Sequence, residues 1–218
     1  VTQCEFTGNH APVGGVFFLT GSNSTITSCI FKDNYVNDSA GDDPGGVFYI
    51  TGGVHSIINC GFSGNTADEG GAMYLTNTSV NIQNVTIRNN TANSEGGGIF
   101  FNNCSPCSIT DSILYLNQPE QILVNQGSSP TVTYWDVEGG WTGTGNFDSF
   151  PYFYGDFYLS RIDTGQPWDS PCFDVGSDSS SAICFNDTSG PVCMDAMTTR
   201  WDHLNDTGTV DLGFHRSG

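Results

Sequence analysis

A sequence repeat of 23 to 31 residues limits this chain to a small set of architectures. Its frame is an apolar residue, then Cys or a small residue three positions later, an apolar residue two further on, and Asn three after that. The five copies are Val1, Cys4, Phe6 and Asn9; Ile26, Cys29, Phe31 and Asn34; Ile57, Cys60, Phe62 and Asn65; Ile82, Val85, Ile87 and Asn90; and Ile109, Ser112, Leu114 and Asn117. A degenerate sixth copy consists of Val132, Trp135, Val137 and Gly140. Such self-similarity is typical of solenoid folds, in which each unit buries its apolar face against its neighbours.

Each repeat unit is too short and too rich in glycine to form a pair of helices. Its β-branched and aromatic runs of three to five residues are typical of short strands between turns. We therefore predict an all-β fold, a right-handed parallel β-helix of about six coils with three short strands per coil. We expect the coils to span residues 1–140, and an irregular, aromatic-rich C-terminal cap packed on the helix to span residues 141–218.

The spacing within each unit indicates a bend. Side chains on a straight strand alternate with a period of two, so Ile57 and Cys60 cannot both point inward unless the chain bends between them. The residue before the Cys column is polar in all five copies. These residues are Gln3, Ser28, Asn59, Asn84 and Asp111. We expect this bend, with its polar side chains, to face solvent.

The asparagine that ends each copy forms the most regular column of the repeat. The column consists of Asn9, Asn34, Asn65, Asn90 and Asn117. Identical amides stacked at the strand spacing of about 4.8 Å can hydrogen-bond to one another along the axis. We therefore expect a stacked asparagine ladder at one corner of the helix, which holds each coil over the last.

A glycine pair and an apolar strand follow each of the first four asparagines, and strand alternation sends one set of side chains outward. We expect the outward set to be the one that carries both tyrosines, as an aromatic ladder across four coils. This ladder consists of Phe18, Tyr49, Tyr74 and Phe100. Such a surface would contact a partner or serve as a platform on which sugars stack. The alternative is that a lateral loop or the C-terminal segment covers it.

Glycosylation signals favour an extracellular location. Eight Asn-X-Ser/Thr sequons are present, at Asn23, Asn37, Asn77, Asn84, Asn89, Asn103, Asn186 and Asn205. This number exceeds what the composition would give by chance. We predict N-glycosylation at these residues and secretion from a eukaryotic cell, although Asn, Ser and Thr are also common in β-helix turns. The glycans at Asn23, Asn77 and Asn103 would align along one edge, because each follows the same strand of its coil.

The eight cysteines, an even number, agree with an oxidising compartment. Cys184 and Cys193 flank a Gly-Pro turn, so we predict a disulfide between them. We predict a second disulfide between Cys104 and Cys107, which bracket a Ser-Pro hairpin. A zinc site at Cys104 and Cys107 would need a second pair of ligands at a suitable spacing, and the sequence offers none.

The chain is strongly acidic. Its formal charge of −18 reflects 23 acidic residues against Lys32, Arg88, Arg161, Arg200 and Arg216. These five residues form no basic patch, which argues against nucleic acid as a partner. No apolar run is long enough to span a membrane. The sequence begins at Val1, which already belongs to the repeat, so we expect a processed chain or an excised segment.

Four stretches of the C-terminal part resemble a known family. They are YWDVEGGWTGTGNFDSFPYF from Tyr134, GDFYLS from Gly155, SPCFDVGSDS from Ser170 and DTGTVDLGFH from Asp206. They are similar to the C-terminal signature of secreted right-handed β-helix proteins of the choice-of-anchor Q type. The resemblance covers nearly all of the chain and implies a β-helix of Gly-Gly-containing coils that this signature closes. It implies no particular activity, because a fold does not determine a function.

Parallel β-helices also include polysaccharide-degrading enzymes, and this chain has few of the residues that such enzymes need. Asp42 and Asp43 form an acidic pair with Asp33 and Asp38 nearby, but the N-T-D, G-H-G and R-I-K motifs of polygalacturonases are missing. A pectate-type lyase needs a basic residue beside calcium carboxylates, and only Arg88 lies deep in the coil region. We therefore predict no catalytic residues and no enzyme activity.

No cofactor is expected. Four histidines share no spacing and are interpreted as turn or cap residues. They are His10, His55, His203 and His215. In the tail, Asp202, Asp206 and Asp211 could hold a structural calcium ion, because hard cations favour clustered carboxylates. We favour turn capping over calcium binding for these three aspartates.

These features favour a non-catalytic structural or adhesive subunit of an extracellular glycoprotein assembly. Val1 already occupies a strand, so the first coil would expose unpaired backbone groups that a neighbouring subunit could cover. Repeated end-to-end contacts of this kind would build a filament, with copies of the chain or neighbouring extracellular subunits as partners. The first alternative is a carbohydrate-binding module with glycans as ligands, and the second is a polysaccharide lyase or hydrolase.

Overall fold

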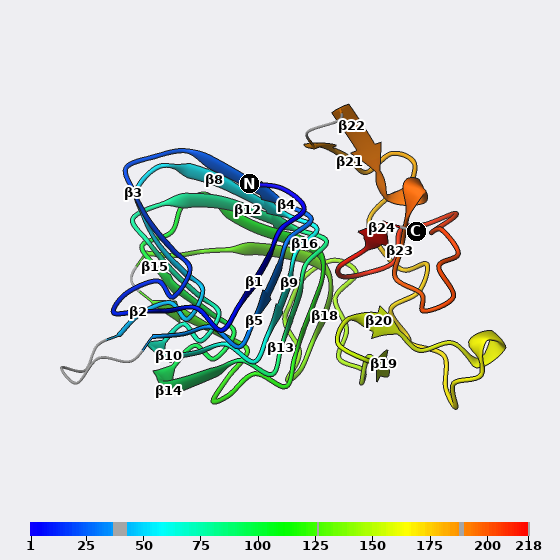
Figure 1. Cartoon of the computed structure of the whole chain (residues 1–218), viewed down its shortest axis with the longest axis horizontal. Helices are drawn as coiled ribbons and strands as arrows, with labels where there is room; N and C mark the ends of the chain where they lie inside the picture. The colour runs from blue at the N-terminus through cyan, green and yellow to red at the C-terminus, as the bar shows by residue number, and fades with distance from the viewer. Residues whose placement is uncertain (37–42, 126, 188–189, 218) are drawn as a thin grey trace.

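The computed structural model describes residues 1–36, 43–125, 127–187 and 190–217. These residues form a parallel β-helix of about five turns, compared with the six expected (Figure 1). They contain no α-helix, only the short 3₁₀ turns η1 (Ile162–Thr164) and η2 (Met194–Ala196). The C-terminal segment lies beside the coils (Figure 1).

Three parallel sheets form the sides of the helix. One sheet, which we call the open sheet, contains β3 (Phe17–Thr20), β7 (Phe48–Thr51), β11 (Met73–Thr76), β15 (Ile99–Asn102) and β17 (Ile122–Asn125). The smallest sheet contains β2 (His10–Ala11), β6 (Tyr35–Val36), β10 (Thr66–Glu69) and β14 (Thr91–Glu95). Equivalent strands of successive turns pair in register, so each column of the repeat becomes a file along the axis.

The third sheet is folded along its length by the expected bend. Before the bend lie β4 (Ser24–Thr27), β8 (Val54–Ile58) and β12 (Ser79–Gln83). After the bend lie β1 (Glu5–Thr7), β5 (Ile30–Lys32), β9 (Gly61–Ser63) and β13 (Thr86–Arg88). The longer strands β16 (Cys107–Tyr115) and β18 (Thr131–Val137) run through the bend and join the two halves.

A residue in the left-handed conformation produces the bend in every turn. The backbone φ angle is between +50° and +54° at six stacked positions, which are Gln3, Ser28, Asn59, Asn84, Asp111 and Tyr134. One such residue interrupts the strand alternation, which lets Ile57 and Cys60 both point into the core. The expectation that this file faces solvent is wrong in the middle turns, because Asn59, Asn84 and Asp111 are buried beneath the C-terminal segment.

The asparagine column forms a continuous hydrogen-bonded file, as the sequence pattern predicts. The Nδ2 atom of Asn34 donates to Oδ1 of Asn65 over 2.9 Å, and the same Oδ1 accepts the backbone N–H of Asn34 over 3.0 Å. The same two bonds join Asn9 to Asn34, Asn65 to Asn90, and Asn90 to Asn117. Gln121 accepts from the last amide of the file. Each turn is therefore fixed over the next by side-chain and backbone donors together.

Aromatic files fill the interior beside this asparagine file. Phe6, Phe31 and Phe62 stack with their ring centroids 5.2 and 4.9 Å apart. Phe17 and Phe48 pack edge-on against these rings. The core is therefore a set of side-chain stacks whose spacing follows the rise from one turn to the next.

Both expected disulfides are present. They join Cys104 to Cys107, with Cα atoms 6.0 Å apart, and Cys184 to Cys193, with Cα atoms 3.9 Å apart. The other four cysteines have free thiols and are Cys4, Cys29, Cys60 and Cys172. Cys29 and Cys60 are fully buried in the Cys column, where they pack as small apolar residues.

The C-terminal segment packs along the flank of the helix on the side of the bend. It contains three antiparallel strand pairs, namely β19 (Phe153–Tyr154) with β20 (Tyr158–Leu159), β21 (Cys184–Asp187) with β22 (Gly190–Cys193), and β23 (Met197–Thr198) with β24 (Arg216–Ser217). The Phe157 ring lies over Gly61, where an added Cβ atom would come within 2.8 Å of it. The backbone N–H of Phe214 donates to the Thr86 hydroxyl over 3.0 Å. The segment thus contacts the middle turns of the helix.

Asp136 joins β18 to this segment. Its carboxylate accepts the backbone N–H of Ser149 over 3.0 Å and the thiol of Cys172 over 3.2 Å. Burial raises the pKa of Asp136 to about 6, and the nearby Asp148 carboxylate acts in the same direction. The folded chain therefore holds a proton at Asp136 more tightly than the unfolded chain does.

Asn65→Ala should destabilise the helix strongly, because it removes an amide from the middle of the asparagine file. The backbone N–H of Asn34 would lose its acceptor and the carbonyl oxygen of Phe31 would lose its side-chain donor, at about 1–3 kcal/mol per group. We expect the free energy of unfolding, measured by urea denaturation, to fall by roughly 3–5 kcal/mol. Asn9→Ala is the control, because Asn9 is exposed at the end of the file and should cost about 1 kcal/mol. Equal losses in the two variants would contradict the role given to the file.

The raised pKa of Asp136 predicts a gain in stability as the pH falls. The protonated form dominates below about pH 6 in the folded chain, but only below the ordinary value of 3.8 in the unfolded chain. The free energy of unfolding should therefore rise between pH 7 and pH 4, by up to roughly 3 kcal/mol from this group. Asp136→Asn should reduce this slope in urea titrations at several pH values, whereas Asp195→Asn, at an exposed position, should leave it unchanged. An unaltered slope in Asp136→Asn would refute the assignment.

Candidate functional site

Aromatic rings stack across the outer face of the open sheet. Strand alternation points Phe17 into the core and turns the next residue outward, and the same holds in β7 and β11. The outward rings stack in order, Phe18 on Tyr49 at 5.2 Å, Tyr49 on Tyr74 at 5.4 Å, and Tyr74 on Phe100 at 4.7 Å between centroids. Neighbouring ring planes differ by at most 12°. The four rings therefore form one continuous stack.

Stacking occupies most of the ring faces. Nearly parallel rings with centroids about 5 Å apart must lie over one another, because coplanar neighbours would need a wider separation. Tyr49 and Tyr74 are half-buried, and each has a stacked ring on both sides. The Asn102 amide donates to the Tyr74 hydroxyl over 3.2 Å. Phe18, the first ring of the stack, is 55 % exposed.

The expectation that Phe100 belongs to the contact surface is wrong. Phe100 is only 2 % exposed and lies between its register partners Tyr74 on β11 and Leu123 on β17. The exposed part of the stack consists of Phe18, Tyr49 and Tyr74, which we call the aromatic stripe. Threonines two residues further along β3 and β7 face the same way and place hydroxyl groups beside the rings.

Six of the eight sequon asparagines are exposed, namely Asn23, Asn77, Asn89, Asn103, Asn186 and Asn205. Asn77 and Asn103 are neighbours on the edge that follows the aromatic stripe, and the Asn103 amide donates to Oδ1 of Asn77 over 2.7 Å. Asn37 lies outside the described residues. The structure contradicts glycosylation at Asn84, whose side chain is fully buried and whose amide has no hydrogen-bond partner among the described residues.

An acidic pocket of about 420 Å³ opens beside the smallest sheet. Asp33, Asp43 and Asp68 contribute carboxylates to its lining, and no Lys or Arg lines it within the described ranges. Asp38 and Asp42, which are close to Asp43 in sequence, lie outside those ranges. The pocket thus offers acidic groups but no cation to hold an acidic sugar.

All five cationic side chains of the protein lie in or against the C-terminal segment. Lys32 on β5 bonds to Asp156 at 2.5 Å. The Arg88 guanidinium donates to the carbonyl oxygens of Gly155 and Asp156 over 3.0 and 2.7 Å. Arg216 lies over the Tyr158 ring, 5.1 Å from its centroid. These contacts attach the segment to the helix and to itself.

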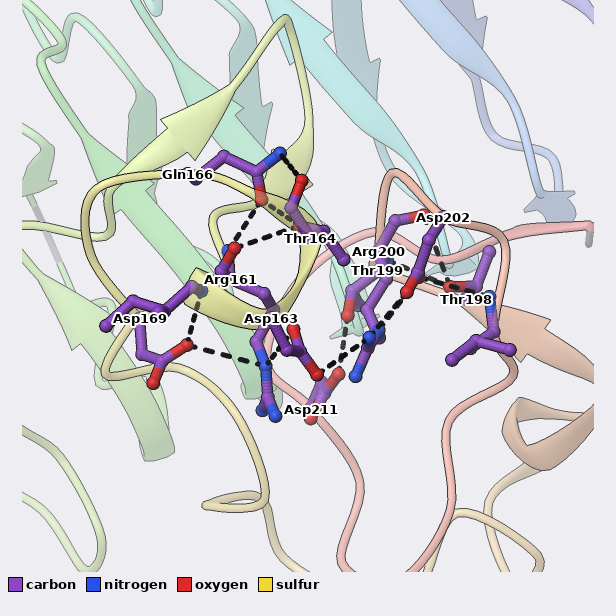
Figure 2. A network of polar contacts seen from close by, with 12 residues as sticks. Arg161, Asp163, Thr164, Gln166, Asp169, Thr198, Thr199, Arg200, Asp202 and Asp211 are labelled. Atoms are coloured by element: carbon purple, nitrogen blue, oxygen red, sulfur yellow. Dashed lines mark hydrogen bonds and ion pairs between the residues drawn. The ribbon is translucent and has the colours of Figure 1, made fainter.

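The remaining two arginines belong to a polar network within the segment (Figure 2). Arg200 bonds to Asp202 at 2.5 Å and to Asp163 at 3.1 Å. Arg161 lies 3.5 Å from both Asp163 and Asp169. Internal contacts therefore engage every Lys and Arg of the chain, and Asp202 is paired with an arginine.

The sequence suggested a group of Asp202, Asp206 and Asp211, but in the structure the third member of this group is His215. Asp206, Asp211 and His215 are buried, and their potential ligand atoms all lie within 4.8 Å of one another. Burial, with a smaller contribution from the neighbouring Asp206 carboxylate, raises the pKa of Asp211 to about 6. His215 shares no spacing with the other three histidines, so a spacing pattern does not connect it with Asp206 and Asp211. The signal was the run DTGTVDLGFH, which contains all three residues.

A family model described as "Right handed beta helix region" matches residues 1–134. No curated protein and no solved structure matches the chain. The matched family includes both polysaccharide-degrading enzymes and non-enzymes, so the match establishes the fold and not the role. The resemblance to the choice-of-anchor Q type stays a prediction. The described ranges contain no helix with the length and apolarity needed to cross a membrane.

Production in a glycosylating cell should leave Asn84 unmodified, because a glycan there would occupy the space in which the C-terminal segment packs. Asn89, exposed five residues later, is the internal comparison and should accept a glycan. Enzymatic glycan release in heavy-oxygen water, followed by peptide mass spectrometry, marks each occupied asparagine. The six stacked left-handed residues, from Gln3 to Tyr134, are called the bend file. A folded, secreted chain with a glycan on Asn84 would show that the bend file is open to solvent.

Proposed function

Because the chain belongs to the family of right-handed β-helix regions, we propose that it is a non-catalytic structural or adhesive module of an extracellular glycoprotein assembly. The observation that carries this proposal is the aromatic stripe of Phe18, Tyr49 and Tyr74. It lies on the sheet that neither the C-terminal segment nor the acidic pocket adjoins. Exposed aromatic side chains gathered in one stripe are typical of surfaces that contact a partner.

A protein surface fits the aromatic stripe better than a sugar does. A sugar ring packs on an open aromatic face, and stacking within the stripe covers most such faces. The edges and hydroxyl groups of Tyr49 and Tyr74 suit contacts with protein side chains and backbone, where tyrosine is enriched. Copies of this chain, or neighbouring extracellular subunits, are therefore the proposed partners.

The distribution of charge supports a non-catalytic role. Ion pairs or hydrogen bonds with the C-terminal segment hold Lys32, Arg88, Arg161 and Arg200, so none of these four is placed to hold an acidic substrate or to act as a base in a pectate-type elimination. Arg216 lines a pocket of about 510 Å³ together with Glu5. Two disulfides and six exposed sequons support an extracellular location.

The acidic pocket favours one second candidate, a polysaccharide-degrading activity. The carboxylates of Asp33, Asp43 and Asp68 are of the type that protonates a leaving oxygen and activates water. Release of reducing ends or unsaturated products from polysaccharides, abolished by Asp43→Asn, would establish this activity. That result would replace the non-catalytic proposal.

Replacing the aromatic stripe should weaken association. We expect Phe18→Ser combined with Tyr49→Ser to raise the dissociation constant of self-association at least about tenfold, because the stripe loses one exposed and one half-buried ring. Sedimentation equilibrium of the glycosylated chain measures this constant, and electron micrographs of native material show whether fibres form. Val54→Ser is the matched control, since Val54 on β8 is 58 % exposed and lies outside the stripe.

Three outcomes would count against this form of the proposal. A chain that stays monomeric at every concentration and adheres to no extracellular partner would refute it. Equal effects of the stripe variant and Val54→Ser would show that the stripe has no special role. Glycan-array binding that Phe18→Ser or Tyr49→Ser abolishes would favour a carbohydrate-binding module instead.

A further inference from the structure

Three side chains of the types that bind metals converge where the C-terminal segment meets the coils. Asp206 and Asp211 precede β24, and His215 directly adjoins it. All three side chains are buried: Asp206 is 5 % exposed, Asp211 is 3 % exposed and His215 is fully buried. The Nε2 atom of His215 lies 2.9 Å from Oδ2 of Asp206. Neither the β-helix repeat nor the aromatic stripe uses this group.

The surroundings of His215 fix both the position and the tautomer of its ring. The backbone N–H of His215 donates to Oδ1 of Asn59 over 2.6 Å, and Nδ2 of Asn59 donates to the His215 carbonyl over 2.9 Å. The Nδ1 atom lies 3.0 Å from the carbonyl oxygen of Gly213, which can only accept, so Nδ1 carries a proton. A histidine that binds a metal through Nε2 almost always donates its other N–H in this way.

The two carboxylates are held by hydrogen bonds as well. Oδ1 of Asp211 accepts the backbone N–H of Asp174 over 2.8 Å, and its Oδ2 accepts the Thr199 hydroxyl over 2.5 Å. Oδ2 of Asp206 accepts the backbone N–H of Asp211 over 3.0 Å. Such outer contacts orient ligand carboxylates in metal sites.

The contacts of the ring nitrogens separate two descriptions of this group. Without a metal, both ring nitrogens of His215 face acceptors, the Gly213 carbonyl and the Asp206 carboxylate, so each nitrogen must carry a proton. A divalent cation between the two carboxylates and a neutral imidazole leaves no net charge. The second description also removes the need for a proton on Nε2.

We propose that Asp206, Asp211 and His215 bind one Zn²⁺ ion, which holds the end of the C-terminal segment together where it packs on the coils. One imidazole nitrogen and two carboxylates match the ligand types and the small ligand number that Zn²⁺ accepts. Calcium fits less well, because it takes six to eight oxygen ligands and does not favour imidazole. Because the His215 backbone is bonded to Asn59 among the bend residues, the ion would lie where the segment docks on the third copy of the repeat.

The test uses the full-length chain, purified after denaturation with a chelator and refolded with or without added Zn²⁺. We expect one Zn²⁺ per chain by elemental analysis and a rise of several degrees in Tm, with little effect of Mg²⁺. Refolding with Co²⁺ should produce visible absorption bands of a nitrogen- and oxygen-ligated ion. Folded wild-type protein that retains no Zn²⁺ and shows no Co²⁺ bands would overturn the proposal in favour of a direct Asp206–His215 ion pair.

Substitutions of the proposed ligands test which residues bind the ion. His215→Gln and Asp211→Asn should each weaken Zn²⁺ binding more than about 100-fold. His55→Gln is the matched control, because His55 is also buried and bonded, to Ser24 and the Gly52 carbonyl, but lies on β8 away from the group. Equal loss in the control and the ligand variants would overturn the assignment. If a ligand variant does not fold, the stoichiometry and Co²⁺ spectrum of the wild-type chain still decide the question.

Discussion

The amide file at one corner of the helix is the interaction on which the other features depend. In each step of the file, one carboxamide oxygen accepts both the backbone and the side-chain N–H of the asparagine in the preceding turn, as in Asn34 and Asn65. Asn34, Asn65 and Asn90 are fully buried, so a slip of one residue would leave several polar groups without partners. This penalty fixes the register of every turn. The stacked phenylalanines, the bend file and the aromatic stripe are aligned because the amides are aligned.

Features that recur once per turn could be predicted from the sequence. A column of identical residues at the repeat period is visible in the sequence, so the spacing alone predicted the asparagine file. Strand alternation predicted the outward direction of Phe18 and Tyr49. The two short-range disulfides followed from local turn chemistry. Glycosylation and partner contact at the predicted residues stay predictions, since geometry alone does not test them.

Contacts made only once per chain could not be predicted in the same way. Asn59 and His215 are 156 residues apart, and no period relates them. The polar bend residues were expected in solvent because water would satisfy their side chains. Groups of the C-terminal segment take the place of water for Asn59 and Asp111, as the Ser177 backbone N–H and hydroxyl do for Asp111. The Asn84 amide is buried with no hydrogen-bond partner among the described residues. Burial of Asn84 has the same origin, because it lies in the file between Asn59 and Asp111 and is covered with them.

The bend and the C-terminal segment together decide which side of the helix is left for contact. A left-handed residue turns a polar side chain away from the core once per turn, and these groups form a strip on which an irregular segment can dock. Docking there draws Lys32 and Arg88 into contacts with Gly155 and Asp156 and concentrates the positive charge of the chain on that flank. The smallest sheet adjoins an acidic pocket. Among the described residues neither of these covers the open sheet, which carries the aromatic stripe that we propose as a partner contact.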